Sequence, residues 1–119
     1  MSAKEIVQEF YKSDVMLESD SVSKLLHQDV VLEWHSSKGF LKLHHDDILA
    51  LSSELSKAYV RSKIRITHIV EEGNTVAIRY SHYVKTIENP REEMLLAHFM
   101  VVWELKAKKL FKGYQMSQL

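Results

Sequence analysis

The stretch MLLAHFMVVWEL, residues 94–105, is the longest apolar segment of the chain. Successive side chains of a β-strand point to opposite faces, so the stretch divides into two sets. One set is Leu95, Ala97, Phe99, Val101, Trp103 and Leu105, and the other is Leu96, His98, Met100 and Val102. Both sets are apolar, whereas an antiparallel strand with one wet face carries polar side chains on that face. The stretch therefore predicts a strand that is covered on both sides.

The segments around it have the same alternating character. In VAIRYSHYV, residues 76–84, one predicted face carries Val76, Ile78, Tyr80, His82 and Val84. The other face carries Ala77, Arg79, Ser81 and Tyr83. The segments 62–70 and 109–117 also alternate, and turns over 71–74, 88–93 and 106–108 separate the four. This spacing is typical of long antiparallel strands in a single sheet.

The N-terminal half is predicted to be mainly helical. Apolar residues recur at helical spacing over 3–12 and 44–59, and a short helix over about 19–28 starts at SDS, which supplies capping side chains. Between them, 29–37 and 40–43 favour two strands. We therefore expect an α+β fold in which helices cover one face of a curved sheet. The residues of the third helix that are predicted to face the core are Ile48, Leu51, Leu55 and Tyr59.

Composition limits the class of protein. The chain has 119 residues, which suits one domain over 1–119, and 16 basic residues balance 16 acidic ones. A zero net charge argues against nucleic-acid binding. The absence of cysteine excludes disulfides, thiol catalysis and cysteine-bound zinc. With neither a signal-peptide pattern nor an apolar run of about 20 residues, we expect no membrane association and a cytoplasmic location.

Two segments resemble a known family. FYKSDVMLESDSVSKLLHQDVVLEW, residues 10–34, and AHFMVVWELKAKKLFKGYQMS, residues 97–117, resemble the SnoaL-like branch of the NTF2-like superfamily. The resemblance implies a long N-terminal helix and two shorter helices packed in a strongly curved antiparallel or mixed sheet. This NTF2-like cone encloses an apolar pocket with an open end. It also implies a homodimer through the outer sheet face, in agreement with the two-sided apolar strand; the residues expected there are Leu96, His98, Met100 and Val102.

The resemblance gives no ready catalytic set. Positions that hold a carboxylate base, a tyrosine and a protonated acid in steroid-isomerase relatives fall here on Trp34, on Phe10, and near Met100 or Val101. The acidic residue of polyketide cyclases corresponds to Gln115 or Ser117, and the Asp-Arg-Asp set of epoxide-hydrolase relatives has no counterpart. Whether the chain is an enzyme is therefore left open.

The stretch LEWHS, residues 32–36, is predicted to direct Trp34 into the pocket and to leave Glu33 and His35 outside. His82 shares the inward face with Tyr80 and is the candidate catalytic residue, as a neutral general base. The alternative is a structural histidine that hydrogen-bonds to Tyr80 or Gln115. HHDD, residues 44–47, is assigned to the polar start of a helix, and we expect neither a metal site nor another cofactor.

Three functions remain open. The chain could bind a small apolar or aromatic molecule, act as a lyase, isomerase or hydrolase through His82, or serve as a dimerisation or partner-binding domain with a filled pocket. We take the first as the leading hypothesis. The residues expected around the ligand are Phe10, Trp34, Tyr59, Tyr80, Phe99, Trp103 and Gln115.

Overall fold

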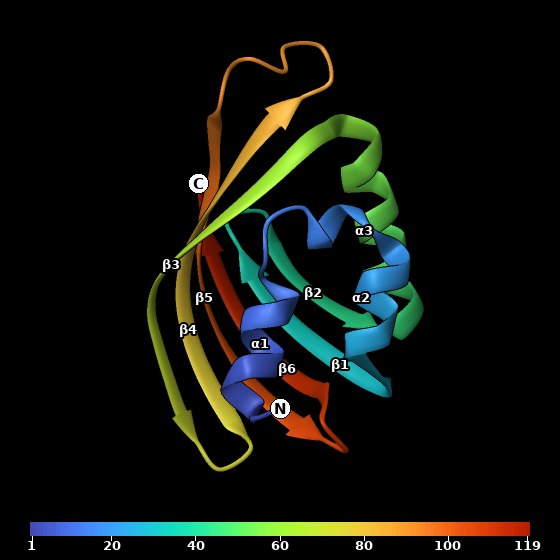
Figure 1. The fold of residues 1–119 in the computed structure, drawn as a ribbon, viewed down its shortest axis with the longest axis vertical. Helices are drawn as coiled ribbons and strands as arrows, with labels where there is room; N and C mark the ends of the chain where they lie inside the picture. Colours follow the sequence, from blue (N-terminus) through green and yellow to red (C-terminus); the bar gives the residue numbers. More distant parts are fainter.

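The computed structural model describes residues 1–119 and confirms an α+β architecture of helices packed on one mixed sheet (Figure 1). None of its helices is long and apolar enough to span a membrane. The elements in chain order are α1 (Ala3–Phe10), the 3-10 helix η1 (Val15–Leu17), α2 (Ser19–Leu25), β1 (Leu26–Ser36), β2 (Gly39–His44), α3 (His45–Ala58), β3 (Tyr59–Glu72), β4 (Thr75–Thr86), β5 (Met94–Lys106) and β6 (Lys109–Gln118).

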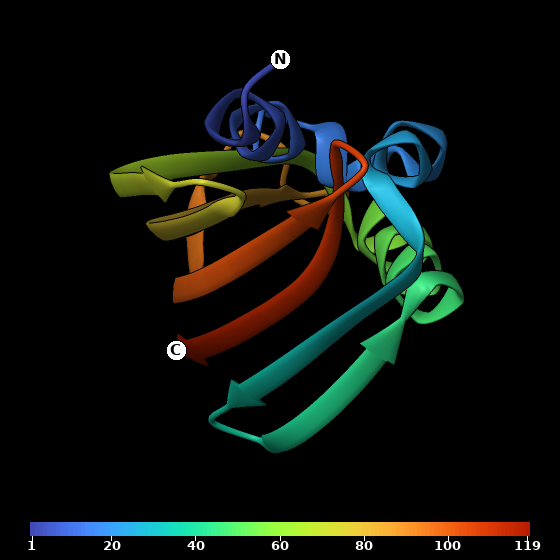
Figure 2. The same cartoon turned by 90° about the horizontal axis from the view of Figure 1, so that it is seen from below.

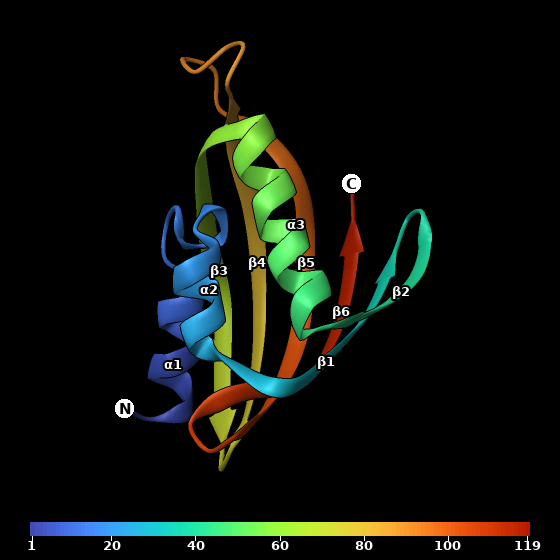
Figure 3. The ribbon, with the colours of Figure 1, turned by 90° about the vertical axis from the view of Figure 1, so that its right-hand side faces the viewer.

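The six strands form one sheet in the order β2-β1-β6-β5-β4-β3. All neighbouring strands are antiparallel except β1 and β6, which are parallel. The sheet curves strongly, and the helices lie along its concave side (Figure 2). Helix α1 packs against β3 and β4, whereas α3 packs against β1, β2 and β3. Figure 3 shows α3 running across the concave side, with the β1–β2 hairpin projecting beside the end of β6.

The prediction of a long N-terminal helix is wrong. Helix α1 has only 8 residues, and the longest helix is α3, with 14. The chain leaves α1 at Tyr11 and is then tied to β3 through Asp14, whose left-handed backbone (φ 69°) redirects it. The Asp14 backbone N–H donates to the Ser62 carbonyl (2.7 Å), and its carboxylate accepts from the Ser62 N–H (2.9 Å) and from Arg61 (2.8 Å). These bonds and the left-handed backbone fix Asp14 in a non-helical position beside β3.

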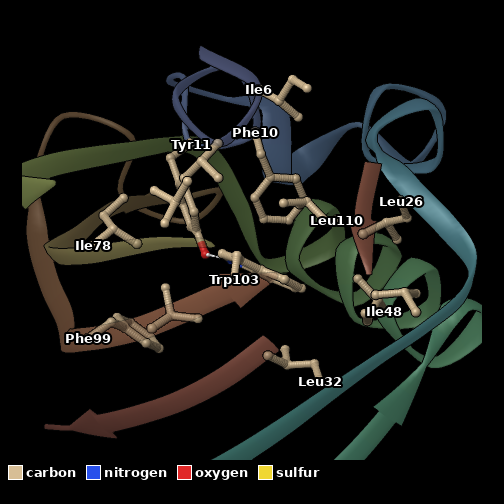
Figure 4. Packing of buried hydrophobic residues seen from close by; sticks show 14 of the residues in the cluster. Ile6, Phe10, Tyr11, Leu26, Leu32, Ile48, Ile78, Phe99, Trp103 and Leu110 are labelled. Carbon is tan, nitrogen blue, oxygen red and sulfur yellow. Dashed lines mark hydrogen bonds between the residues drawn. The ribbon is translucent and has the colours of Figure 1, made fainter. Parts of the chain in front are cut away.

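The core lies between the helices and the concave face. The alternation predicted for β4 is confirmed, because Val76, Ile78, Tyr80, His82 and Val84 are all buried. Figure 4 shows Trp103 below Phe10 and Tyr11, with the Trp103 Nε1–H donating to the Tyr11 hydroxyl at 2.9 Å. Gly113 on the neighbouring strand makes room for this indole, since a Cβ there would lie 2.7 Å from Trp103 Cζ3.

The faces of β5 follow the predicted alternation only as far as Ala97. From Ala97 to Leu105 the odd-numbered residues are buried, and His98, Met100 and Val102 are exposed on the convex face. The prediction that Leu95 faces inward and Leu96 outward is wrong. A β-bulge shifts the register, because His82 pairs with Ala97 while Tyr83 pairs with Leu95, which leaves Leu96 as an extra residue. Leu95 is 46% exposed, and Leu96 turns to the concave side.

Candidate functional site

A cavity of about 120 Å³ lies between the concave face and the helices. Of its 16 lining residues, 13 are hydrophobic and none is charged at neutral pH. The structure places six of the seven predicted ligand-binding residues, together with His82, around this cavity. Those six are Phe10, Trp34, Tyr80, Phe99, Trp103 and Gln115.

Tyr59 is the exception, and the prediction that it lines the pocket is wrong. Helix α3 ends at Ala58, and Tyr59 already has the extended backbone (φ −126°, ψ 141°) of the first residue of β3. Its side chain therefore leaves the helix face that Ile48, Leu51 and Leu55 share, and those three do line the cavity.

Aromatic rings form much of the wall. Tyr80 and Phe99 stack with ring centroids 4.8 Å apart, and the Tyr11 ring centroid lies 4.7 Å from that of Tyr80. Trp34 lies 6.2 Å from Phe99, and its Nε1–H donates to the Ser117 hydroxyl at 2.8 Å. The two planar, apolar surfaces of Phe99 and Trp34 suit contact with another flat ring.

Tyr11 is a lining residue that the sequence prediction did not include. It occupies the end of α1, one turn after Val7, and both side chains are buried. Their helical spacing is a signal for this position, although only the neighbouring Phe10 is predicted from the sequence as a lining residue. Burial raises the pKa of Tyr11 and of Tyr80 well above the usual value, so both hydroxyls stay protonated at physiological pH.

His82 is buried on β4 beside a serine of β3. The His82 Nε2 and the Ser62 Oγ lie 2.6 Å apart, so the structural hypothesis of a bond to Tyr80 or Gln115 is wrong in its partner. Burial lowers the pKa of His82 from 6.5 to about 4, and the imidazole is therefore neutral at neutral pH. Its other nitrogen, Nδ1, has no partner within the chain. Every fully enclosed side-chain nitrogen or oxygen of the chain has a hydrogen-bond partner, so the unpaired Nδ1 must be accessible.

Gln115 brings a second free polar group to the cavity. It lies on β6 opposite Trp34 in the parallel β1–β6 pair, and its side chain is only 7% exposed. The amide makes no hydrogen bond within the chain, and, as for His82, it is not fully enclosed. The cavity thus has an apolar wall with two unpaired polar groups, on strands that flank β5.

The remaining polar motifs of the sequence lie outside this cavity. Leu32 and Trp34 line it, so Glu33 and His35 belong to the opposite face of β1, as predicted. At the HHDD motif, the Asp47 carboxylate accepts from the His44 backbone N–H (2.9 Å) at the start of α3. No three His, Asp or Glu side chains converge on one point.

Comparison with known proteins gives a fold. No protein-family model and no curated protein matches the chain. Among solved structures, an LEH-like epoxide hydrolase of M. tuberculosis is 16% identical, with TM-score 0.74, over 97% of this chain and 81% of that one. A protein of Jannaschia assigned as a SnoaL-like polyketide cyclase is 10% identical, with TM-score 0.72, over 97% and 84%. An NTF2-like protein of unknown function from Burkholderia pseudomallei is 16% identical, with TM-score 0.67, over 97% and 90%.

The chain therefore has the NTF2-like fold, as its resemblance to SnoaL-like proteins implied. Identities of 10–16% show the fold alone. The cavity itself adds one observation about chemistry, because no Asp or Glu lines it.

Proposed function

We propose that the cavity binds a small neutral molecule, aromatic or otherwise flat and apolar, that carries a hydrogen-bonding group. The observation that carries this proposal is an apolar cavity lined by two polar side chains, Gln115 and His82, in which the Gln115 amide and His82 Nδ1 have no partner in the chain and remain accessible. An accessible polar group in an apolar cavity bonds either to water or to a polar group of a ligand. A bound ligand would supply the missing partner.

The size and charge of the cavity define the class of ligand. A dry apolar cavity of about 150 Å³ holds one benzene molecule, and this cavity of about 120 Å³ is close to that size. A charged ligand would be buried without a counter-charge, because no lining side chain is charged and His82 is neutral. A single ring with one hydroxyl, amine or carbonyl group fits these limits, and phenol is a suitable probe.

The test is calorimetric titration of phenol into the wild-type protein and the Gln115→Leu variant. Leucine keeps the apolar contacts of the site and removes the amide, so we expect about tenfold weaker binding, equivalent to about 1.4 kcal/mol. Gln118→Leu is the matched control, since Gln118 is an exposed residue of the same strand. Phenol that binds neither the wild type nor the variants would contradict the proposal.

The alternative of an enzyme that uses His82 as a general base is less favoured by the geometry. A general base works best when its pKa is near the operating pH, and a pKa of about 4 makes His82 a weak base at pH 7. His82→Gln separates the two functions, because a binding protein would keep its ligand with a modest loss of affinity. An enzyme with this substitution would still bind its substrate but would no longer convert it to product.

We also propose that the chain forms a homodimer through the convex sheet face. Because Leu96 turns to the concave side, the apolar residues that β5 presents on the convex face are Met100 and Val102, which are 60% and 38% exposed. Tyr114 and Met116 on β6 pair with them directly and are 41% and 65% exposed. These four side chains and His98 form a continuous surface suited to an isologous contact.

A further inference from the structure

A second hollow of about 310 Å³ borders the cavity at one end of the sheet. It lies between the β1–β2 hairpin, the beginning of β5 and the end of β6, the region where the hairpin projects in Figure 3. We call it the outer groove. The hairpin contributes Phe40 and Leu41, each 50% exposed, and β5 contributes Ala97. Lys38 is the only charged side chain among its lining residues.

The outer groove and the cavity share a wall. Three side chains, Trp34, Leu96 and Phe99, line both hollows. Trp34 is the largest of them and is only half-buried. Its hydrogen bond to Ser117 Oγ fixes the indole on the groove side, because Ser117 lines the groove and not the cavity.

The β-bulge explains how Leu96 takes part in this wall. It turns Leu96 to the concave side, next to Ala97, so that two consecutive residues of β5 face the groove. All three residues belong to strands that are paired on both sides, and the Trp34 indole is held at its tip by a single side-chain hydrogen bond. The indole is large and half-buried, so it can turn toward the groove once this one bond breaks.

We propose that the cavity and the outer groove are two compartments of one ligand site, and that Trp34 sets the length of ligand it accepts. This inference rests on the proposed function. The ring of the ligand occupies the cavity, and an apolar chain attached to the ring extends into the groove only when Trp34 gives way. The ligand class is a neutral phenol-like ring with an alkyl substituent, because the groove surface that would meet the chain, formed by Phe40, Leu41 and Ala97, is apolar.

The test is a homologous series from phenol to 4-hexylphenol, titrated into the wild type, Trp34→Ala and Ser117→Ala. In the wild type, we expect affinity to stop rising after the first one or two carbons, since the cavity holds little more than the ring. In Trp34→Ala, we expect it to continue rising about fourfold per methylene group, the gain from burying one such group. Ser117→Ala keeps the indole and removes its anchor, so its rise should lie between the two.

Two matched controls exclude general effects of truncation. Phe111→Ala removes an aromatic ring of β6 that lines neither hollow, and Ser36→Ala removes a groove hydroxyl that bonds to the Gly39 carbonyl and not to Trp34. Both should behave like the wild type. If Trp34→Ala does not fold, Trp34→Phe keeps a ring without the N–H donor and should show a smaller rise in the same direction.

The outcomes separate this inference from the function on which it rests. If the affinity of the wild type already rises fourfold per methylene up to 4-hexylphenol, Trp34 does not divide the two hollows. If the affinity of Trp34→Ala does not rise along the series, the groove does not bind the alkyl chain. Either result overturns the inference while phenol binding still supports the proposed function. Absence of phenol binding in every variant overturns both.

Discussion

On the central strand β5, both the concave and the convex face of the sheet carry apolar residues, but only those on the concave face are buried. On β5, Phe99, Val101 and Trp103 are nearly fully buried, whereas Met100 and Val102, which alternate with them, are 60% and 38% exposed. The difference lies in what covers each face. The helices of the chain close the concave side, and nothing in the chain closes the convex side.

The comparison shows that apolar character alone does not define a core. The concave face combines ring packing with internal hydrogen bonds, such as Trp103 to Tyr11 and His82 to Ser62. The convex face places two methionines side by side next to a charged side chain, since Met100 pairs with Arg79 on one side and with Met116 on the other. Substitutions on the concave face should therefore change folding, and those on the convex face should change association.

The largest expected effect is that of Trp103→Ala on the concave face. The indole is 1% exposed, and its loss removes buried area, leaves a void and deprives the Tyr11 hydroxyl of its donor. We expect the free energy of unfolding to fall by about 3–5 kcal/mol, measured by urea denaturation. A loss below about 1 kcal/mol would mean that the concave core is not closed as described.

Acid should weaken the concave face through His82. The unfolded chain binds a proton at this residue with a pKa near 6.5, whereas the folded chain does so only near 4. Between these values the unfolded state holds more protons, so stability is flat above pH 6.5 and falls as the pH drops from 6.5 to 4. This group alone should account for a loss of about 3 kcal/mol.

The check is the pH dependence of unfolding in His82→Gln, which should lose less stability over that range than the wild type. His68→Gln is the matched control, because His68 is an exposed histidine of β3. Equal acid sensitivity in the wild type and His82→Gln would contradict the burial of a neutral imidazole.

A single methyl group should also disturb the concave face. In Gly113→Ala, the new Cβ would lie 2.7 Å from both Trp103 Cζ3 and Leu32 Cδ1, so the indole or the strand must move. We expect a loss of about 1–3 kcal/mol, typical of overpacking. Gly73→Ala gives a contrasting case, because its Cβ would meet no atom and only its positive φ (58°) opposes the change. A Gly113→Ala protein as stable as the wild type would show that this contact is loosely packed.

The smallest effect on folding should come from Met116→Glu on the convex face. Met116 is 65% exposed in the single chain, so we expect the monomer's unfolding free energy to change by less than about 0.5 kcal/mol. Sedimentation should instead show a shift from dimer to monomer, because the charge would enter the proposed interface. Met94→Glu, at the far end of β5, is the control and should leave the dimer intact. A wild-type monomer would refute the proposed use of this face.

Much of the fold could be predicted from local pattern. The alternation in β4 and in β5 from Ala97 onward identified the buried residues, because a regular strand repeats every two residues. The same rule correctly placed Trp34 inward and Glu33 outward. Most of the cavity's aromatic wall followed from these two observations.

The errors occur where the backbone departs from regular geometry. The bulge at Leu96 and the left-handed Asp14 have no clear signature in the residues themselves, because both are fixed by pairing with other strands. The Ser62 partner of His82 was missed for a related reason. The two lie 20 residues apart and meet through the β3–β4 register, which also contains irregularities.

The parallel pairing of β1 with β6 has a consequence for synthesis of the chain. Strand β1 begins at Leu26, and the ribosome makes β6 only from Lys109 onward. Until then β1 has only β2 as a partner, and one wall of the cavity, including Gln115, does not exist. Pairing across so long a loop is entropically costly and slow. A nascent chain therefore cannot hold a ligand, and newly made molecules should be most vulnerable to aggregation in the interval before β6 emerges from the ribosomal tunnel.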